Sequence, residues 1–264
     1  MIIDFHAHIF PDTLAPRAVK SLTDNTGGLY SPCTDGTAAG LTAYMDECGV
    51  DISVVQPVAT KPTQITRTNE WAVNTANERL IFFGAFHPDT DDYKRDIEHI
   101  CALGFKGIKL HAEYQDFHLD EPKMLKIYDY AFSRGLIILQ HAGFDPAYKP
   151  PFRTSPKQFA NVAKQMQGGI MIAAHFGGHD QWDDVEKYIV GTNIYIDTSM
   201  GFSYYQHEQF LRIVKSHGSD KVLFATDSPW SRAEEEIAAL ESMELTRQEK
   251  DNIFYKNAKR ILNI

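Results

Sequence analysis

Two histidines near the start of the chain have a spacing that suits metal chemistry. His6 and His8 belong to the run 4–8, which reads Asp-Phe-His-Ala-His. On a β-strand, residues two apart point to the same side, so both imidazoles would face one point. Two neutral imidazoles on one side can share a divalent metal, although such a pair alone is a weak signal. Asp4 has the same parity, so it either orients a ligand from behind or is fixed by the backbone near the floor of the fold.

Further titratable residues follow other apolar runs of the chain. They are His87, His111, His141, His175 and Asp227. A lone buried histidine is usually a satisfied core residue, but a buried polar group is costly unless it is paired or bound to a ligand. If the apolar runs are parallel strands of one barrel, their carboxyl ends meet on one face, where catalytic groups lie. We therefore predict a metal site on that face.

The apolar runs themselves predict the strands of such a barrel. They cover residues 2–5, 52–56, 80–85, 107–110, 137–140, 170–174, 194–196 and 222–225. Each is continuously apolar, as expected for a parallel strand that is buried on both faces. Between the runs, apolar residues recur at helical spacing, and a glycine follows several of these stretches as a cap. Over residues 1–264 the pattern predicts a single (β/α)8 barrel domain, with an open doubly wound sheet as the competing arrangement.

The loops that follow the predicted strands contain the candidates for substrate contacts. Residues 10–36 form the longest irregular region, which we interpret either as a lid over the active site or as an ordinary surface loop. Arg67 and Arg153 can each hold a substrate carboxylate by two hydrogen bonds, although most loop arginines are only solvated. Trp230 can form a wall for an apolar or aromatic substrate. Phe202, Tyr204 and Tyr205 have the same two interpretations, as substrate walls or as packing residues.

Composition excludes several classes of protein. The net charge of -9 argues against a nucleic-acid binder and against an anionic membrane surface as the partner. No apolar run approaches the roughly 18 residues of a membrane span, and the first residues do not read as a signal peptide. The three cysteines form no CxxC pair, which favours a reducing compartment. We expect a cytoplasmic protein with a small-molecule substrate and no nucleic-acid or membrane partner, and leave open whether it forms a homodimer.

Read in order, the motifs of the chain resemble those of the amidohydrolase superfamily. They are DFHAH at 4–8, GFKGIKLH at 104–111, QHAG at 140–143, AHFGG at 174–178, YIDTS at 195–199, LFATDSP at 223–229 and KNAKRIL at 256–262. The resemblance covers the whole chain and is strongest to the amidohydrolase-related branch that includes aminocarboxymuconate-semialdehyde decarboxylase. It implies a TIM barrel that ends in a C-terminal helix, but it indicates no substrate.

The resemblance also implies roles for individual residues. The family pattern makes His6, His8, His141 and Asp227 the metal ligands. It makes His175 a catalytic residue beside the metal. Three imidazoles and one carboxylate suit Zn2+ with one position open for water, whose pKa the metal lowers toward neutrality. Asp227 would then accept the proton of that water, while His175 would orient the water or polarise a substrate oxygen.

Lys109 decides between one metal and two. Some branches of the superfamily carry a carboxylated lysine at the end of the fourth strand, where it bridges two metals, and Lys109 lies at about that place. His111 lies two residues nearer the mouth, so we interpret His111 as a substrate or outer-sphere residue and predict one metal per chain, with a bridging Lys109 as the alternative. His87 is predicted as a further substrate contact. His179 is interpreted as a surface histidine, with a substrate contact as the alternative.

Three functions remain open at this point. The leading hypothesis is hydrolysis of an amide, ester or lactone bond in a small molecule, and the compact chain favours it slightly. The alternative is non-oxidative decarboxylation of an aromatic or unsaturated acid, because the same metal set can bind substrate oxygens while Asp227 protonates carbon. The third is a metal-binding barrel without activity, which would require the loss of a ligand or catalytic residue, and the family pattern has lost none here.

Overall fold

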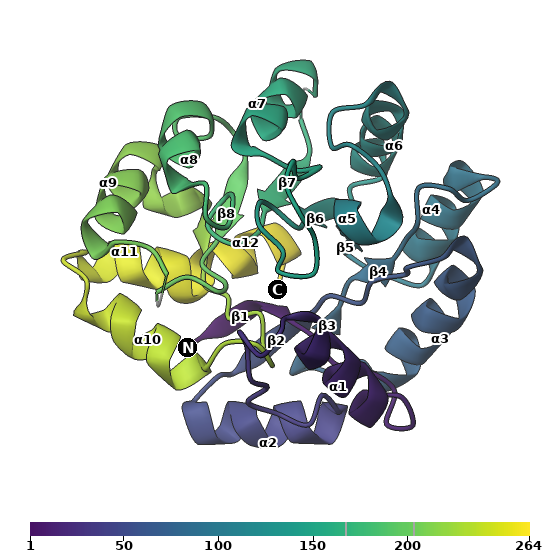
Figure 1. The fold of residues 1–264 in the computed structure, drawn as a ribbon, viewed down its shortest axis with the longest axis horizontal. Helices are drawn as coiled ribbons and strands as arrows, with labels where there is room; N and C mark the ends of the chain where they lie inside the picture. Colours follow the sequence, from purple (N-terminus) through teal and green to yellow (C-terminus); the bar gives the residue numbers. More distant parts are fainter. Residues whose placement is uncertain (167, 203) are drawn as a thin grey trace.

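A computed structural model describes residues 1–166, 168–202 and 204–264 of the chain. Short parallel strands form a ring at its centre, and helices surround the ring (Figure 1). The strands are β1 Ile3–Ala7, β2 Ile52–Val55, β3 Leu80–Phe82, β4 Gly84–Ala85, β5 Gly107–Leu110, β6 Ile137–Gln140, β7 Ile170–Ala173, β8 Tyr195–Asp197 and β9 Val222–Leu223. They pair in chain order as two parallel sheets, β1 to β3 and β4 to β9.

Backbone hydrogen bonds join the two sheets into a barrel. At one seam Phe5 N donates to Phe224 O (2.9 Å) and Asp227 N donates to His6 O (2.7 Å). At the other seam β3 and β4 are two parts of the predicted strand 80–85, and Phe83 N between them donates to Val55 O (3.0 Å). The predicted (β/α)8 barrel is therefore confirmed, and the open doubly wound sheet is wrong.

The helices follow the strands in the expected alternation. They are α1 Ala15–Asn25, α2 Ala38–Cys48, α3 Ile65–Thr75, α4 Tyr93–Ala102, α5 Ala112–Gln115, α6 Pro122–Ser133, α7 Pro156–Gln165, α8 Trp182–Tyr188, α9 His207–His217, α10 Ala233–Ser242, α11 Arg247–Asp251 and α12 Asn257–Leu262. Short η1 Pro62–Gln64, η2 Ser219–Lys221 and η3 Asn252–Lys256 complete the set. Side-chain oxygens of Thr37, Ser155 and Thr246 accept the free N–H groups at the starts of α2, α7 and α11, which fixes where these helices begin. None of the described helices has the length and apolar composition that a bilayer crossing requires.

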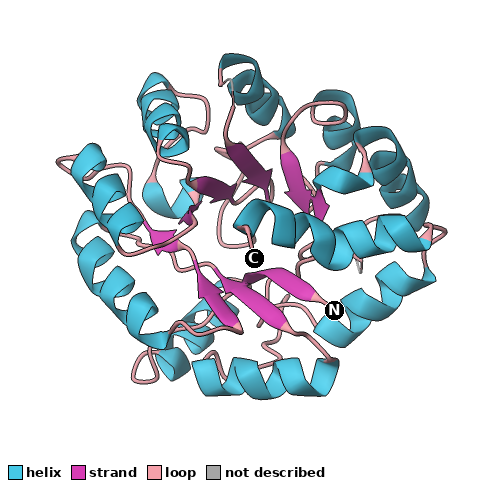
Figure 2. Cartoon of the chain, turned by 180° about the vertical axis from the view of Figure 1, so that it is seen from behind, coloured by secondary structure: helices cyan, strands magenta, loops and turns pink. Residues whose placement is uncertain are grey.

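The core has two layers, one inside the strand ring and one between the ring and the helices. Phe5, Val54 and Leu139 belong to the inner cluster, together with Ala258 and Leu262 of α12. Figure 2, seen from behind, shows α12 across that end of the barrel. The C-terminal helix therefore closes one end of the ring, and the other end is left for the site.

The region 10–36 is not wholly irregular, as the sequence suggested, because it contains the helix α1. Its composition of Pro, Gly, Asp and Thr hides a segment with apolar residues at helical spacing. Ala15 and Val19 are buried, and Pro16 starts the helix where its missing N–H costs nothing.

Candidate active site

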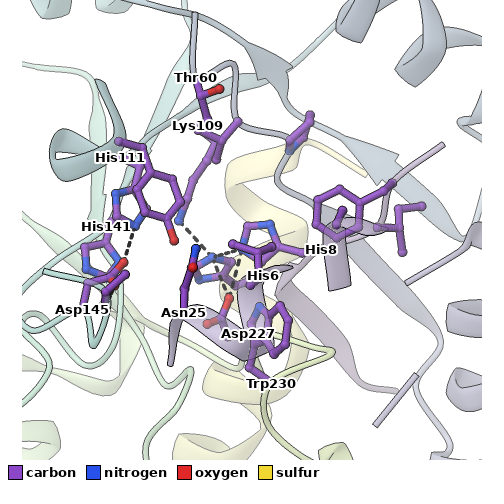
Figure 3. A pocket seen from close by; sticks show the side chains of 18 of the residues that line it. His6, His8, Asn25, Thr60, Lys109, His111, His141, Asp145, Asp227 and Trp230 are labelled. Carbon is purple, nitrogen blue, oxygen red and sulfur yellow. Dashed lines mark hydrogen bonds and ion pairs between the residues drawn. The ribbon is translucent and has the colours of Figure 1, made fainter. Parts of the chain in front are cut away.

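The carboxyl ends of the strands deliver the predicted residues to one cavity of about 670 Å³. His6 and Lys109 come from β1 and β5, and the other side chains come from the segments just beyond strand ends. Among the predicted residues that line the cavity are His6, His8, His111, His141, His175 and Asp227. Figure 3 shows two groups of them: His6, His8 and Asp227 beside Lys109, and His111 and His141 beside Asp145.

His6, His8 and Asp227 form a cluster that suits a divalent metal. The two Nε2 atoms are 3.1 Å apart, and they lie 3.3 Å and 3.0 Å from Asp227 Oδ1. Donors bound at about 2.1 Å to one tetrahedral metal are separated by about 3.4 Å, so these atoms already converge as a metal requires. We call these three residues the floor cluster.

A hydrogen bond orients His6 of the floor cluster, and burial lowers the pKa values of His6 and of the neighbouring Lys109. His6 Nδ1 lies 3.0 Å from Asp197 Oδ2, which turns Nε2 toward the cavity. Burial lowers the pKa of His6 well below its ordinary value, so the imidazole is neutral, as a ligand must be. Lys109 Nζ lies 2.9 Å from His6 Nε2, and burial lowers the pKa of Lys109 to about 8. Lys109 therefore reaches the cluster, as a bridging lysine would, and the number of metals stays a prediction.

His141, the fourth predicted ligand, lies beside the floor cluster rather than within it. Its Nδ1 is 3.0 Å from His175 Nε2. Its Nε2 is buried and has no hydrogen-bond partner among the described residues. An unpaired buried nitrogen costs about 1–3 kcal/mol, which a bound ligand would relieve. The predicted ligand set therefore has three converging members, whereas the fourth, His141, groups with His111 and Asp145 (Figure 3).

His175 is fixed by residues that the sequence analysis gave no role. Its backbone N–H donates to Asp197 Oδ1 (3.0 Å), and its Nδ1 lies 2.9 Å from Ser199 Oγ. His175 has a left-handed backbone with φ of 56°, which is uncommon for a residue with a side chain and turns its ring toward His141. Asp197 and Ser199 stand two apart at the end of β8, so the period-two argument applied to the motif 195–199 could have found them.

A second polar group faces the cavity from β5 and β6. His111 Nε2 lies 3.2 Å from Asp145 Oδ2, and the His111 ring stacks between Tyr114 (3.7 Å) and His141 (4.0 Å). Donor atoms of His111, His141 and Asp145 lie within 4.8 Å of one another. Stacked parallel rings send their lone pairs in parallel directions, so this group suits hydrogen bonds to a substrate better than one shared metal. Asp145, in the loop after β6, was not predicted.

The other predicted substrate residues divide into two classes. Arg67 and Trp230 line the cavity. His87 and Arg153 are not among its lining residues in the part of the chain that the structure describes. Arg153 pairs with Asp116 instead (2.5 Å), and His87 Nδ1 accepts the backbone N–H of Asp89 (3.1 Å). The structure therefore brings only the first class to the site.

His179 is buried, so its interpretation as a surface histidine is wrong. Only 5% of it is exposed, it lines the cavity, and its Nε2 lies 3.3 Å from the hydroxyl of Tyr30. The loop after β7 is drawn inward because Gly143 packs directly on the His179 backbone. A Cβ on Gly143 would come within 2.4 Å of His179 N, so only glycine fits.

The aromatic residues after β8 mostly serve as packing. Phe202 and Tyr205 are buried against Phe210, with ring centroids 4.9 Å and 5.3 Å away. Tyr204 is 41% exposed and meets Tyr30 edge-on at 6.1 Å. None of the three is a lining residue of the cavity within the described chain.

Comparison with known proteins places these features in a family. A family model described as "Amidohydrolase" matches residues 3–264. An uncharacterised TIM-barrel protein from Bordetella bronchiseptica is similar in structure, with a TM-score of 0.79, 16% identity, and coverage of 99% of this chain and 98% of that one. No curated protein matches the sequence.

Two solved decarboxylases are also similar over the full length. A 2,6-dihydroxybenzoate decarboxylase bound to 2,6-dihydroxybenzoate has a TM-score of 0.71 and 14% identity, with 100% of this chain and 99% of that chain covered. A 5-carboxyvanillate decarboxylase from Novosphingobium aromaticivorans, complexed with manganese and 4-hydroxy-3-methoxy-5-nitrobenzoic acid, has a TM-score of 0.72 and 16% identity, with 100% and 96% covered. At these identities the likeness shows a shared fold.

Proposed function

The chain belongs to the amidohydrolase family, and we propose that it is a metal-dependent decarboxylase of an aromatic or unsaturated carboxylic acid. The observation that carries the proposal is a cavity with the floor cluster at its base and aromatic side chains in its walls, among them Tyr114, Phe144 and Trp230. The full-length likeness to two decarboxylases of aromatic acids supports this reaction over the hydrolysis that the sequence favoured.

The residues of the chain divide the proposed reaction between them. A divalent metal at the floor cluster would draw electron density from the substrate oxygens. Asp227, at the edge of the cluster, is the group we assign to take a proton from solvent and deliver it to the ring carbon that bears the carboxylate. The bond from that carbon to the carboxylate then breaks, its electron pair returns to the ring, and CO2 leaves. His175, kept neutral because burial lowers its pKa, would hold a substrate oxygen by a hydrogen bond from Nε2 in place of the contact of that atom with His141.

The identity of the metal is part of the proposal. Imidazoles from His6, His8 and His141 with the Asp227 carboxylate would suit Zn2+ by ligand type. The manganese in the Novosphingobium aromaticivorans enzyme supports Mn2+ as the alternative. Reconstitution of metal-free protein with each ion in turn distinguishes the two by the activity restored.

Hydrolysis of an amide, ester or lactone is the second candidate. The observation in its favour is the free buried Nε2 of His141 next to His175, because the same arrangement can hold and deprotonate a water. It ranks second because the open cavity of about 670 Å³ has largely apolar walls, which suit an aromatic ring.

A two-panel assay tests the proposal. Metal-loaded protein is incubated in D2O with aromatic acids (2,6-dihydroxybenzoate, 5-carboxyvanillate, 2-hydroxybenzoate) and separately with aryl esters, lactones and amides. We expect CO2 release and one deuterium at the ring carbon that lost its carboxylate, detected by mass spectrometry. Asp227→Asn is the control and should abolish both the release of CO2 and the incorporation of deuterium. Turnover in the second panel, with none in the first, would replace decarboxylation by hydrolysis.

A further inference from the structure

The cavity extends beyond the floor cluster into a groove between two helices. Eight of the residues that line it come from these helices and the residues that start them: Leu14, Ala18, Leu22 and Asn25 on the α1 side, and Gln64, Arg67, Thr68 and Trp71 on the α3 side. Figure 1 shows α1 next to α3, outside the ring of strands. We call this extension the α1–α3 groove.

The α1 wall of the groove carries an apolar stripe that packs against no hydrophobic core cluster of the described chain. Leu14, Ala18 and Leu22 are spaced four apart, so they share one face of the helix. They are half-buried, and within the described chain they do not pack against any of the hydrophobic core clusters. Ala15 and Val19, by contrast, are buried on the inner face. The stripe spans about 12 Å along the helix, and its burial under an apolar group of a ligand would favour binding.

The α3 wall supplies a cation and a rigid aromatic ring. Arg67 is exposed and makes no ion pair or side-chain hydrogen bond with another described residue. The ring of Trp71 is fixed edge-on against Phe82, with centroids 5.4 Å apart. Residues 64, 67 and 71 follow helical spacing, so they face the groove together. A guanidinium without an ion-pair partner among the described residues, in the same groove as the apolar stripe, matches an anionic group carried on an apolar arm.

The size of the cavity agrees with a substrate larger than one ring. Its volume of about 670 Å³ lies well inside the roughly 300–1,000 Å³ of pockets that enclose drug-sized ligands. A single aromatic ring at the floor cluster would leave the groove to water and the stripe exposed.

We propose that the substrate is an elongated diacid. One carboxylated ring lies at the floor cluster, and an apolar arm runs along the α1 stripe and carries its second carboxylate to Arg67. The position of the first ring rests on the proposed function, whereas the binding of the arm rests on the groove alone.

Three matched probes test the groove by binding rather than by turnover. They are 2-hydroxybenzoate, 2-hydroxy-4-phenylbenzoate and 2-hydroxy-4-(4-carboxyphenyl)benzoate, titrated calorimetrically into metal-loaded protein. We expect the second ring to lower Kd at least about tenfold, and the second carboxylate to lower it about threefold or more again, as an apolar contact and a partly exposed ion pair do.

Variants on the two walls separate the two contributions. Arg67→Ala should remove the advantage of the second carboxylate and keep that of the second ring. Ala18→Trp should fill the groove and remove the advantage of the second ring. Arg17→Trp is the matched control, because Arg17 is exposed on α1 and is not a lining residue in the described chain, so all three affinities should persist.

The outcomes distinguish this inference from the proposed function. Equal Kd values for the three probes, or no binding of any of them, would overturn the inference. If Kd falls stepwise across the three probes but no decarboxylation is seen, the binding of the arm in the groove is supported. Only the reaction proposed for the floor cluster is then overturned. If Arg17→Trp also removes the differences in Kd between the probes, the inference is overturned. The effect of Ala18→Trp would then come from a disturbed α1 helix and not from a filled groove.

Discussion

The two sides of the cavity are built in different ways. At the floor, His6 and Asp197 lie on strands, are almost fully buried, and are fixed by hydrogen bonds to each other. At the mouth, Leu22 and Arg67 lie on helices; among the described residues, Leu22 packs against no hydrophobic core cluster and Arg67 makes no ion pair. The floor is therefore prepared before any ligand binds, whereas the mouth gains its contacts from the ligand. Chemistry and selectivity can then change separately, because a change at the mouth leaves the floor intact.

The largest effect should come from the floor cluster. Asp227→Ala removes one of three converging donors, so most bound metal and all measurable turnover should be lost. Asp145→Ala is the matched comparison, because it removes a carboxylate from the second polar group and should leave metal content unchanged. Elemental analysis of both purified variants checks this. A metal loss in Asp145→Ala equal to that in Asp227→Ala would mean that the metal binds between the two groups.

Replacement of His175 should separate chemistry from metal binding. His175→Asn should keep the metal and lower kcat roughly 10²-fold or more, as the loss of an electrostatic or acid-base group does. Metal content and turnover are measured on the same sample. Lost metal would make His175 a ligand, and full turnover would remove it from the reaction.

The pH dependence of stability should also distinguish the buried His175 in the cavity from an exposed histidine on the surface. Burial holds the pKa of His175 well below its ordinary value, so below pH 6.5 the unfolded chain takes up a proton that the folded protein does not. This contribution to stability is complete above about pH 6.5 and is lost as the pH falls, by up to about 1.4 kcal/mol per pH unit.

In metal-free His175→Asn that loss is absent. Between pH 6.5 and pH 5.5 the free energy of unfolding of the variant should therefore fall less than that of the parent, by about 1 kcal/mol. Urea unfolding at both pH values measures it. His118→Asn, at an exposed position, should keep the parent slope. Parallel slopes for parent and His175→Asn would mean that His175 takes up its proton in the folded protein.

The smallest effect should come from the contact between the region 10–36 and the loop after β7. Tyr30→Phe removes the hydroxyl that lies 3.3 Å from His179 Nε2. One neutral hydrogen bond contributes about 0.5–1.5 kcal/mol, so KM should rise roughly two- to tenfold with kcat and metal content unchanged. Tyr148→Phe is the control, since Tyr148 is exposed whereas Tyr30 is buried. A change in metal content in Tyr30→Phe would contradict the separation of mouth from floor.

The sequence was most informative where the fold is periodic. The alternation of apolar runs and helical stretches predicted the barrel, and the strand ends predicted that His6, His111, His175 and Asp227 would share a cavity. The period-two argument failed for Asp4, because an irregularity in β1 lies between Asp4 and Ala7. Asp4 instead accepts the backbone N–H groups of His6 and Thr226 (3.1 Å and 3.0 Å), so the backbone-fixed interpretation is correct.

Contacts across the fold were outside the reach of sequence patterns. The spacing of the motif 195–199 could have marked Asp197 as a site residue, but its partner His6 is 191 positions away and becomes its neighbour only when the barrel closes. Asp145 lies in a loop after β6, and no local spacing shows that it meets His111. The inward course of the loop that carries His179 depends on the close approach of Gly143. α1 was missed because Pro, Gly and Thr around it dominate the composition of the region. Each of these errors comes from a tertiary contact or from the averaged composition of a region. The spacing of apolar residues in the strands and helices was interpreted correctly.

Anomalous diffraction from crystals of metal-loaded protein, recorded at the absorption edge of the bound ion, locates the metal directly. We expect one peak per chain at about 2.0–2.2 Å from His6 Nε2, His8 Nε2 and Asp227 Oδ1. A peak between His111 and Asp145, with none at the floor cluster, would contradict this expectation.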